Sequence, residues 1–143
     1  MAEERRNEAA ERAGWCADLL GLGRPLDLWA SGLALVALAA LLFERGSAPL
    51  LWASLGVALI AKYFALRVRL DEAVFRRWAA LWAGADGELP AATMAAFDRA
   101  LGRPAAGRPL ESRCRGAQRL LHWQAVFTVL QTACALAAAM YIR

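Results

Sequence analysis

Residues that bind metals or form disulfides are scarce in this sequence of 143 residues, which contains one histidine and three cysteines. Cys16, Cys114 and Cys134 form no CxxC pair, and the histidine has no cysteine at ligand spacing. Zinc sites and disulfide frameworks depend on such patterns. We therefore predict no metal site, and we expect Cys134, inside an apolar run, to pack as a small hydrophobic side chain.

Catalytic motifs are missing as well. The sequence contains no HExxH, no Walker loop and no Ser/His/Asp set. Asp86 and Glu88 flank a glycine, but two carboxylates fall short of the number of ligands that Ca²⁺ takes. We therefore predict that the protein is not an enzyme and carries no cofactor.

Charge is sparse, and hydrophobic residues take its place. Charged residues make up 21% of the chain and hydrophobic residues 59%, above the roughly 45–50% of soluble domains. The surplus lies in three nearly uncharged runs, 26–43, 49–66 and 120–142. About 18 residues of α-helix extend about 27 Å, enough to cross the hydrocarbon core of a membrane. The runs predict three transmembrane helices, the first two joined by a tight hairpin.

Helical signals continue outside these runs. Apolar residues recur every three or four positions over 3–20, which predicts an amphipathic helix ended by the Gly/Pro segment 21–25. A second stripe over 66–82 predicts that the second transmembrane helix extends beyond the membrane. We also expect a short helix at 90–101 and a long helix from residue 110 to the end.

Together these elements predict an all-α integral membrane protein with three transmembrane helices and amphipathic cytoplasmic helices. We expect an N-terminal amphipathic segment, a two-span hairpin, a cytoplasmic helical loop and a third transmembrane helix, at residues 1–25, 26–66, 67–119 and 120–143.

Basic residues are distributed unevenly along the chain. Ten arginines lie in 67–119 and four in 1–25, whereas the hairpin carries only Arg45 and the segment after the third run only Arg143. Because basic residues stay on the cytoplasmic side, we expect a cytoplasmic N terminus and a C terminus outside. The Arg/Ala/Leu/Gly bias is typical of a GC-rich bacterial genome, so the expected location is the bacterial inner membrane.

Four polar residues form a stripe along the third run: Gln124, Thr128, Gln131 and Thr132. Because unpaired polar groups are costly in hydrocarbon, this stripe should face protein or a water-filled cavity. With the small residues Gly32, Ser54 and Gly56, it predicts a helix–helix interface. A ligand or ion path is the alternative. Because one copy would cover the two glutamines poorly, we expect a homo-oligomer or a complex with other membrane-protein subunits.

Lys62 and His122 are open to functional roles. Lys62, inside the second run, is expected to extend its ammonium group to the lipid headgroups, and a buried salt bridge is the alternative. We expect Asp27 to be an ordinary charged residue near the end of a transmembrane helix. His122, beside Trp123, is expected to be an interfacial aromatic residue, and a haem or metal ligand or a proton relay is the alternative.

The segment 67–119 combines basic and aromatic residues. We expect its first helix to contact the membrane surface or a partner through Arg67, Arg69, Phe75, Arg76, Arg77, Trp78 and Trp82. Its aromatic residues share the apolar stripe and its arginines lie opposite, as in an interfacial helix. Ten arginines and six acidic residues leave the segment a net charge of +4, and we predict no nucleic-acid partner.

These features lead to the hypothesis of a non-catalytic accessory, assembly or interaction subunit of a membrane complex. The alternative is a membrane-embedded transport or redox subunit that binds haem, quinone or lipid through His122, Lys62 and the Gln124/Thr128/Gln131 stripe.

Overall fold

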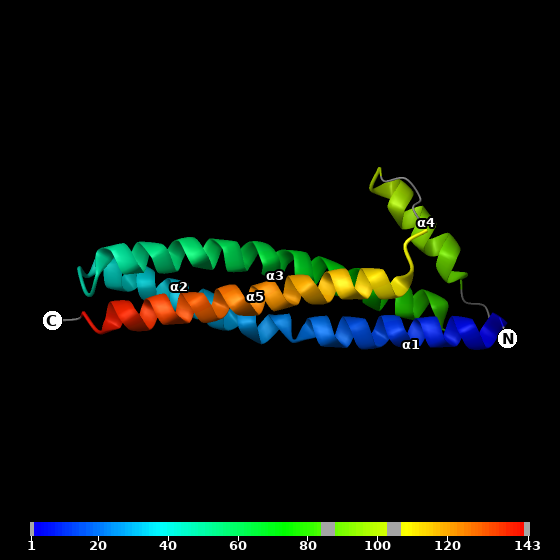
Figure 1. Ribbon diagram of the computed structural model, residues 1–143, viewed down its shortest axis with the longest axis horizontal. Coiled ribbons are helices and arrows are strands. Elements are labelled where there is room, and N and C mark those ends of the chain that lie inside the picture. Colours follow the sequence, from blue (N-terminus) through cyan, green and yellow to red (C-terminus); the bar gives the residue numbers. More distant parts are fainter. Residues whose placement is uncertain (1, 84–87, 103–106, 142–143) are drawn as a thin grey trace. The chain divides into compact units, whose positions relative to one another are not determined.

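The computed structural model describes residues 2–83, 88–102 and 107–141, and every regular element in these ranges is an α-helix. The helices appear in chain order in Figure 1 as α1 (Ala2–Gly21), α2 (Gly23–Leu42), α3 (Ala48–Trp82), α4 (Pro90–Ala100) and α5 (Leu110–Ala139). The all-α prediction is confirmed. The expected extension of the second apolar helix to Trp82 is also confirmed, because α3 is continuous over 35 residues.

Three helical stretches of the described chain are long and apolar enough to cross a membrane: Glu3–Leu42, Ala48–Trp82 and Leu110–Ala139. In the most apolar part of each stretch, only 11%, 22% and 17% of the residues are buried. The apolar side chains therefore point mainly outward instead of filling a protein core. A membrane helix is expected to have such an outward apolar surface.

The Gly/Pro segment at 21–25 interrupts the helix less than the sequence predicted. Only Leu22 separates α1 from α2, and its backbone stays in the right-handed helical region at φ −63° and ψ −16°. Pro25 has no N–H to donate to the carbonyl of Gly21, four residues earlier, which accounts for the gap in the hydrogen-bond ladder. The first apolar helix consequently begins at Gly23 instead of residue 26.

The hairpin between α2 and α3 closes with a Schellman arrangement. The N–H of Arg45 donates to the carbonyl of Ala40 at 2.8 Å, and the N–H of Glu44 donates to that of Leu41 at 3.2 Å. Glu44 adopts a left-handed φ of 51°, a position that glycine usually fills. The predicted tight turn is confirmed.

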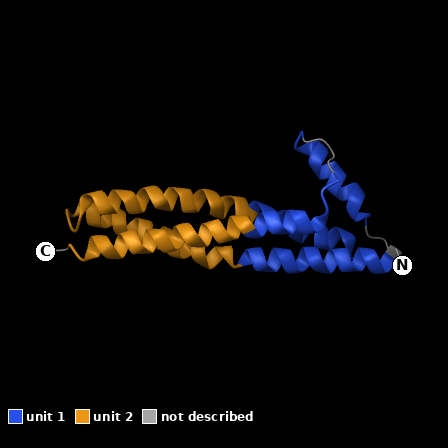
Figure 2. Cartoon of the chain, viewed as in Figure 1, with its two compact units in different colours: residues 1–21, 70–118 blue, residues 22–69, 119–143 orange. Residues whose placement is uncertain are grey.

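The chain divides into two compact units (Figure 2). Unit 1 comprises residues 1–21 and 70–118, and unit 2 comprises residues 22–69 and 119–143. Unit 1 contains α1, α4, the end of α3 and the start of α5, whereas unit 2 contains α2 and the remainder of α3 and α5.

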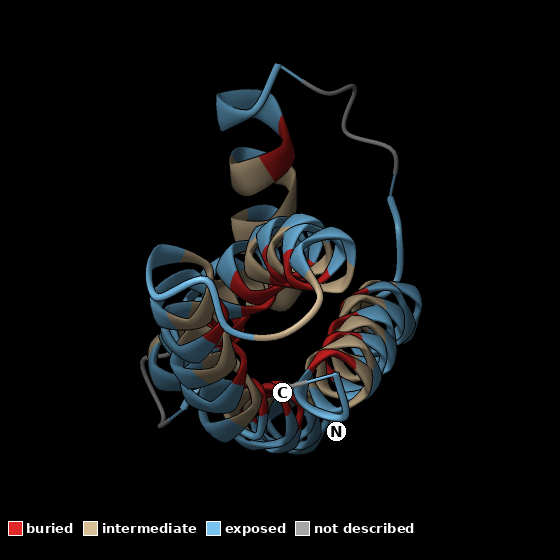
Figure 3. Ribbon diagram, turned by 90° about the vertical axis from the view of Figure 1, so that its left-hand side faces the viewer, coloured by how far each residue is buried: buried red, intermediate tan, exposed pale blue. Residues whose placement is uncertain are grey.

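The interiors of the two units differ in composition. In unit 1, Phe75, Trp78 and Trp82 are buried, and the rings of Trp78 and Trp82 stack at 5.5 Å. In unit 2, most of the buried apolar residues are alanines, which include Ala30, Ala37, Ala58, Ala61, Ala65 and Ala138. Small side chains allow helix backbones to approach closely. Figure 3 shows the buried residues on the inward faces of the helices.

Candidate functional site

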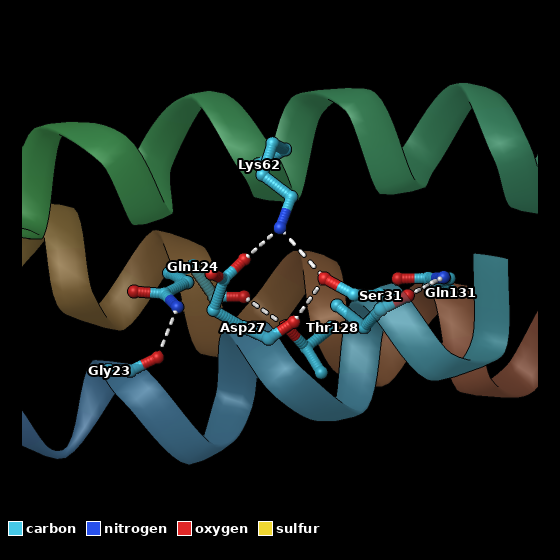
Figure 4. A network of polar contacts seen from close by, with 8 residues as sticks. Gly23, Asp27, Ser31, Lys62, Gln124, Thr128 and Gln131 are labelled. Carbon is cyan, nitrogen blue, oxygen red and sulfur yellow. Dashed lines mark hydrogen bonds and ion pairs between the residues drawn. The ribbon is translucent and has the colours of Figure 1, made fainter. Parts of the chain in front are cut away.

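A lysine–aspartate pair links α3 to α2 inside unit 2 (Figure 4). The ammonium group of Lys62 donates to Asp27 Oδ1 at 2.5 Å and to Ser31 Oγ at 2.7 Å. Ser31 in turn donates to the backbone carbonyl of Asp27 at 2.7 Å. The side chain of Asp27 is 15% exposed and that of Lys62 is 43% exposed. The two charges therefore neutralise each other between two apolar helices.

This pair corrects two expectations. Lys62 was expected to extend its ammonium group to lipid headgroups, with a salt bridge as the alternative, and the structure contains the salt bridge, to a carboxylate of the neighbouring helix. Asp27 was expected to be an ordinary charge near a span end. The signal that could have found the pair was in the sequence, because Asp27 and Lys62 are the two charges within the first two apolar runs.

The two glutamines of the stripe bond to the backbone of α2. The side-chain amide of Gln124 donates to the carbonyl of Gly23 at 2.7 Å, and that of Gln131 donates to the carbonyl of Ala30 at 2.8 Å. The two donors, Gln124 and Gln131, and the two acceptors, Gly23 and Ala30, are each seven residues apart, which is about two helical turns. The parallel helices α2 and α5 therefore keep the same register at both bonds. Gln124 is 1% exposed and Gln131 is fully buried.

The burial of the glutamines removes one argument for an oligomer. A single copy was expected to cover Gln124 and Gln131 poorly, yet α2 of the same chain covers both. Their carbonyl atoms, Gln124 Oε1 and Gln131 Oε1, are nevertheless buried with no hydrogen-bond partner among the described residues. The side-chain amide groups of both glutamines therefore donate hydrogen bonds, whereas their two carbonyl oxygens accept none among the described residues.

Close packing at Gly23 makes the contact with Gln124 possible. A Cβ atom added at Gly23 would lie 2.9 Å from Gln124 Oε1, 3.0 Å from Val68 Cγ1 and 3.3 Å from Leu121 Cδ1. At the first two distances, Gln124 and Val68 would have to shift to make room for a methyl group. Gly23 was not among the interface residues that the sequence predicted, because a glycine near a predicted helix end was interpreted as a helix terminator.

The two threonines bond mainly within their own helix. Thr128 Oγ1 donates to the carbonyl of Gln124 at 2.9 Å, and Thr132 Oγ1 donates to that of Thr128 at 2.8 Å. Thr132 Oγ1 also accepts a hydrogen bond from the indole N–H of Trp29 on α2 at 3.1 Å. Trp29 is thus a further link between α2 and α5 that sequence reasoning did not identify.

The small residues proposed for the interface divide into two groups. Ser54 is fully buried, and its hydroxyl has no partner among the described residues. Gly32 and Gly56 are exposed, and a Cβ atom at either position would meet nothing within 4 Å. They lie on the outward faces of α2 and α3 instead of at the predicted interface.

The predicted docking surface on 66–82 needs a correction. Its arginines at positions 67, 69, 76 and 77 are exposed, but Phe75, Trp78 and Trp82 are 3%, 4% and 0% exposed. Phe97 of α4 meets Trp78 edge to face at 5.4 Å, and the guanidinium of Arg113 on α5 lies 5.7 Å from the Trp78 ring centre. The aromatic residues are therefore the core of unit 1 and are not available to a membrane or a partner.

Exposed apolar residues of unit 1 include two on α1, besides Leu70, Leu89 and Leu101 elsewhere in the unit. Trp15 is 76% exposed and Leu19, one turn later, is 39% exposed. The exposed acidic residues Glu11 and Asp18 lie one turn before and one turn after Trp15. The sequence showed the apolar periodicity of this helix, but not which of its residues remain uncovered.

His122 and the acidic turn show no ligand arrangement. His122 is exposed on α5, and its ring meets that of Trp123 edge to face at 6.2 Å. Glu88 accepts a hydrogen bond from Thr93, whereas Asp86 lies outside the described residues. Within the described ranges, no group of three or more His, Cys, Asp and Glu side chains is placed to hold a metal ion.

Comparison with known proteins gives no match, since no protein-family model, curated protein or solved structure resembles the chain.

Proposed function

We propose that the chain is a three-span protein of the bacterial inner membrane, with its N terminus and unit 1 in the cytoplasm. The outward apolar surfaces of the three stretches support insertion. The arginine distribution supports the orientation, since unit 1 contains most of the arginines and the hairpin only Arg45. The hairpin and the C terminus then lie on the outer side.

The protein acts as a non-catalytic accessory or assembly subunit of a membrane complex, with unit 2 as its anchor. The bonds from Lys62, Gln124 and Gln131 all run to α2, so these polar groups hold the bundle of a single chain together. Interhelical bonds of this kind contribute about 0.6–2 kcal/mol each in membranes. A single chain therefore supplies its own anchor.

The observation that carries the docking role is the exposure of Trp15 in unit 1. Trp15 lies beside the exposed Leu19, and the enrichment of tryptophan at the centres of protein interfaces supports a docking role for this face. Glu11 and Asp18 on either side disfavour the anionic headgroups of a bacterial membrane. The favoured occupant is a protein subunit with an apolar groove and basic residues at its rim.

Purification in a mild detergent followed by blue-native electrophoresis tests this role. The native chain is expected to migrate with a second, different subunit, and Trp15→Ser is expected to lose it. Trp52→Ser is the matched control, because Trp52 is 65% exposed in unit 2 and is expected to contact lipid. A native chain that migrates alone as a monomer, or as a homo-oligomer, contradicts the proposal. Equal loss of the partner in both variants also contradicts it.

The alternative role, a transport or redox subunit, has one observation in its favour. The buried oxygens Gln124 Oε1, Gln131 Oε1 and Ser54 Oγ have no partner among the described residues, and such atoms are acceptors for water or a cation. Under this alternative, Gln131→Leu abolishes flux through the protein in vesicles. A haem bound through His122 would give a Soret band that is lost in His122→Ala, whereas a colourless preparation removes the haem version.

A further inference from the structure

Two cysteines that are far apart in the sequence meet in unit 1. The thiols of Cys16 on α1 and Cys114 on α5 lie close enough to interact, and each shifts the pKa of the other. Both are free thiols, and Cys134 belongs to unit 2. This pairing was not predictable from the sequence, because the spacing of the cysteines resembles no disulfide or metal motif.

A second contact on the same two helices supports the register of this pair. Arg12 Nη1 lies 2.7 Å from Glu111 Oε1, one turn before Cys16 on α1 and one turn before Cys114 on α5. Residues three and four apart share one face of a helix, so the ion pair and the thiols lie on the same facing surfaces. Figure 1 shows α1 and the start of α5 running in the same direction, as this register requires.

The two thiols differ in access and acidity. Cys16 is 4% exposed, whereas Cys114 is only partly buried. The hydrogen bond with Cys114 and burial raise the pKa of Cys16, and the nearby carboxylate of Asp71 adds to this effect. The hydrogen bond from Cys16 lowers the pKa of Cys114, against the opposing effects of burial and of Glu111. Cys114 is therefore the more accessible thiol and the one that more readily forms a thiolate.

We propose that Cys16 and Cys114 form a redox-active dithiol that closes to a disulfide between α1 and α5, with a low-molecular-weight disulfide of the glutathione type as the oxidant. This site goes beyond the proposed accessory role, and its redox use rests only on the proposed cytoplasmic placement of unit 1. Disulfides of cytoplasmic proteins are mostly transient and redox-sensing, and a pair of adjacent free thiols fits that use.

The exchange proceeds in two steps. The thiolate of Cys114 attacks one sulfur of the oxidant, forms a mixed disulfide and releases the first small thiolate, which takes up a proton. Cys16 then loses its proton and attacks the sulfur of Cys114, which releases the second small thiol. The protein loses two electrons and two protons, and the oxidant is reduced to two thiols.

Mass spectrometry of the full-length Cys134→Ser protein in detergent tests the site. After treatment with oxidised glutathione and alkylation of the remaining thiols, we expect an unalkylated chain that has lost two hydrogens. Digestion should yield a peptide pair joined through Cys16 and Cys114, and reduction should restore two alkylation sites. A chain that keeps two alkylable thiols, or forms only dimers between chains, overturns the proposal.

Single variants test the order of attack. Cys16→Ser is expected to accumulate the mixed disulfide on Cys114, because the second thiol is missing. Cys114→Ser should react at least about tenfold more slowly, because only the buried thiol remains. Equal rates for the two variants contradict the assigned order. Because the linked peptide pair is measured with both thiols in place, it tests the disulfide even where a substitution weakens folding.

Discussion

Units 1 and 2 share the long helices α3 and α5, yet different contacts hold their interiors together. Unit 1 packs an aromatic cluster and buries a salt bridge between Arg113 and Asp98, whose side chains are 13% and 7% exposed. Unit 2 packs alanines and joins its helices through side-chain bonds to backbone carbonyls and through the Lys62–Asp27 pair. The same two helices thus change their mode of packing along their length.

Large apolar side chains are exposed along unit 2, whereas unit 1 contains most of the arginines. The exposed residues of unit 2 include Leu35, Val36, Leu59 and Val129, each at least 65% exposed. Burial of large apolar groups drives association in water but contributes little in lipid, where small residues and interhelical polar bonds take over. The proposed placement of unit 2 in the membrane and of unit 1 in water accounts for both differences.

The largest expected effect is in the aromatic core of unit 1. Trp82→Ala removes a side chain with no exposure and should destabilise unit 1 by about 4 kcal/mol, because it leaves a large cavity. Hydrogen exchange of α1 and α4 should accelerate, while the α2 amides remain protected. Trp15→Ala is the matched control, with little expected change because Trp15 is exposed. Equal acceleration in both units would show that they do not differ in what stabilises them.

The two salt bridges, Arg113–Asp98 and Lys62–Asp27, should differ in how much free energy of unfolding is lost when the aspartate is removed. Asp98→Ala leaves Arg113 buried without its carboxylate and should cost about 3 kcal/mol. Asp27→Ala should cost about 1 kcal/mol, because Lys62 is more exposed and its long side chain can reach the headgroups. Denaturation in detergent, with unfolding of each unit followed by hydrogen exchange, measures both. A larger loss of stability in Asp27→Ala than in Asp98→Ala would contradict this expectation.

An effect between those two is expected where α2 packs tightly against α5 at Gly23. Gly23→Ala places a methyl group 2.9 Å from Gln124 Oε1 and should destabilise unit 2 by about 2 kcal/mol through overpacking. Gly56→Ala, with open space at its Cβ position, should leave the thermal midpoint in detergent unchanged. Equal midpoints for the two variants would contradict the close contact between α2 and α5.

Helix positions were predictable because they follow from local sequence. The stripe over 66–82, the proline at 90 and the long run to the C terminus each predict a helix that the structure contains. The partners of polar and aromatic side chains were not predictable in the same way. Trp78 and Trp82 lie on an apolar stripe whether a membrane or α4 covers it, and the sequence alone does not say which.

The polar contacts show the same limit. The spacing of Gln124 and Gln131 predicted that they share a face, and both are buried on it. Their acceptors are backbone carbonyls of α2. Because every residue has a backbone carbonyl, the sequence does not indicate which ones accept these bonds. Likewise, the contact between Cys16 and Cys114 depends on the register between two distant helices, which local patterns do not determine.

Cysteine labelling in intact cells tests most directly the central claim that unit 2 spans the membrane with unit 1 in the cytoplasm. The reporters are Ala48→Cys at the hairpin and Ala100→Cys on α4, both exposed positions, in a chain without its three native cysteines. A membrane-impermeant maleimide should label Ala48→Cys in intact cells and Ala100→Cys only after the membrane is permeabilised. Labelling of Ala100→Cys in intact cells, or of Ala48→Cys only after permeabilisation, would contradict the account.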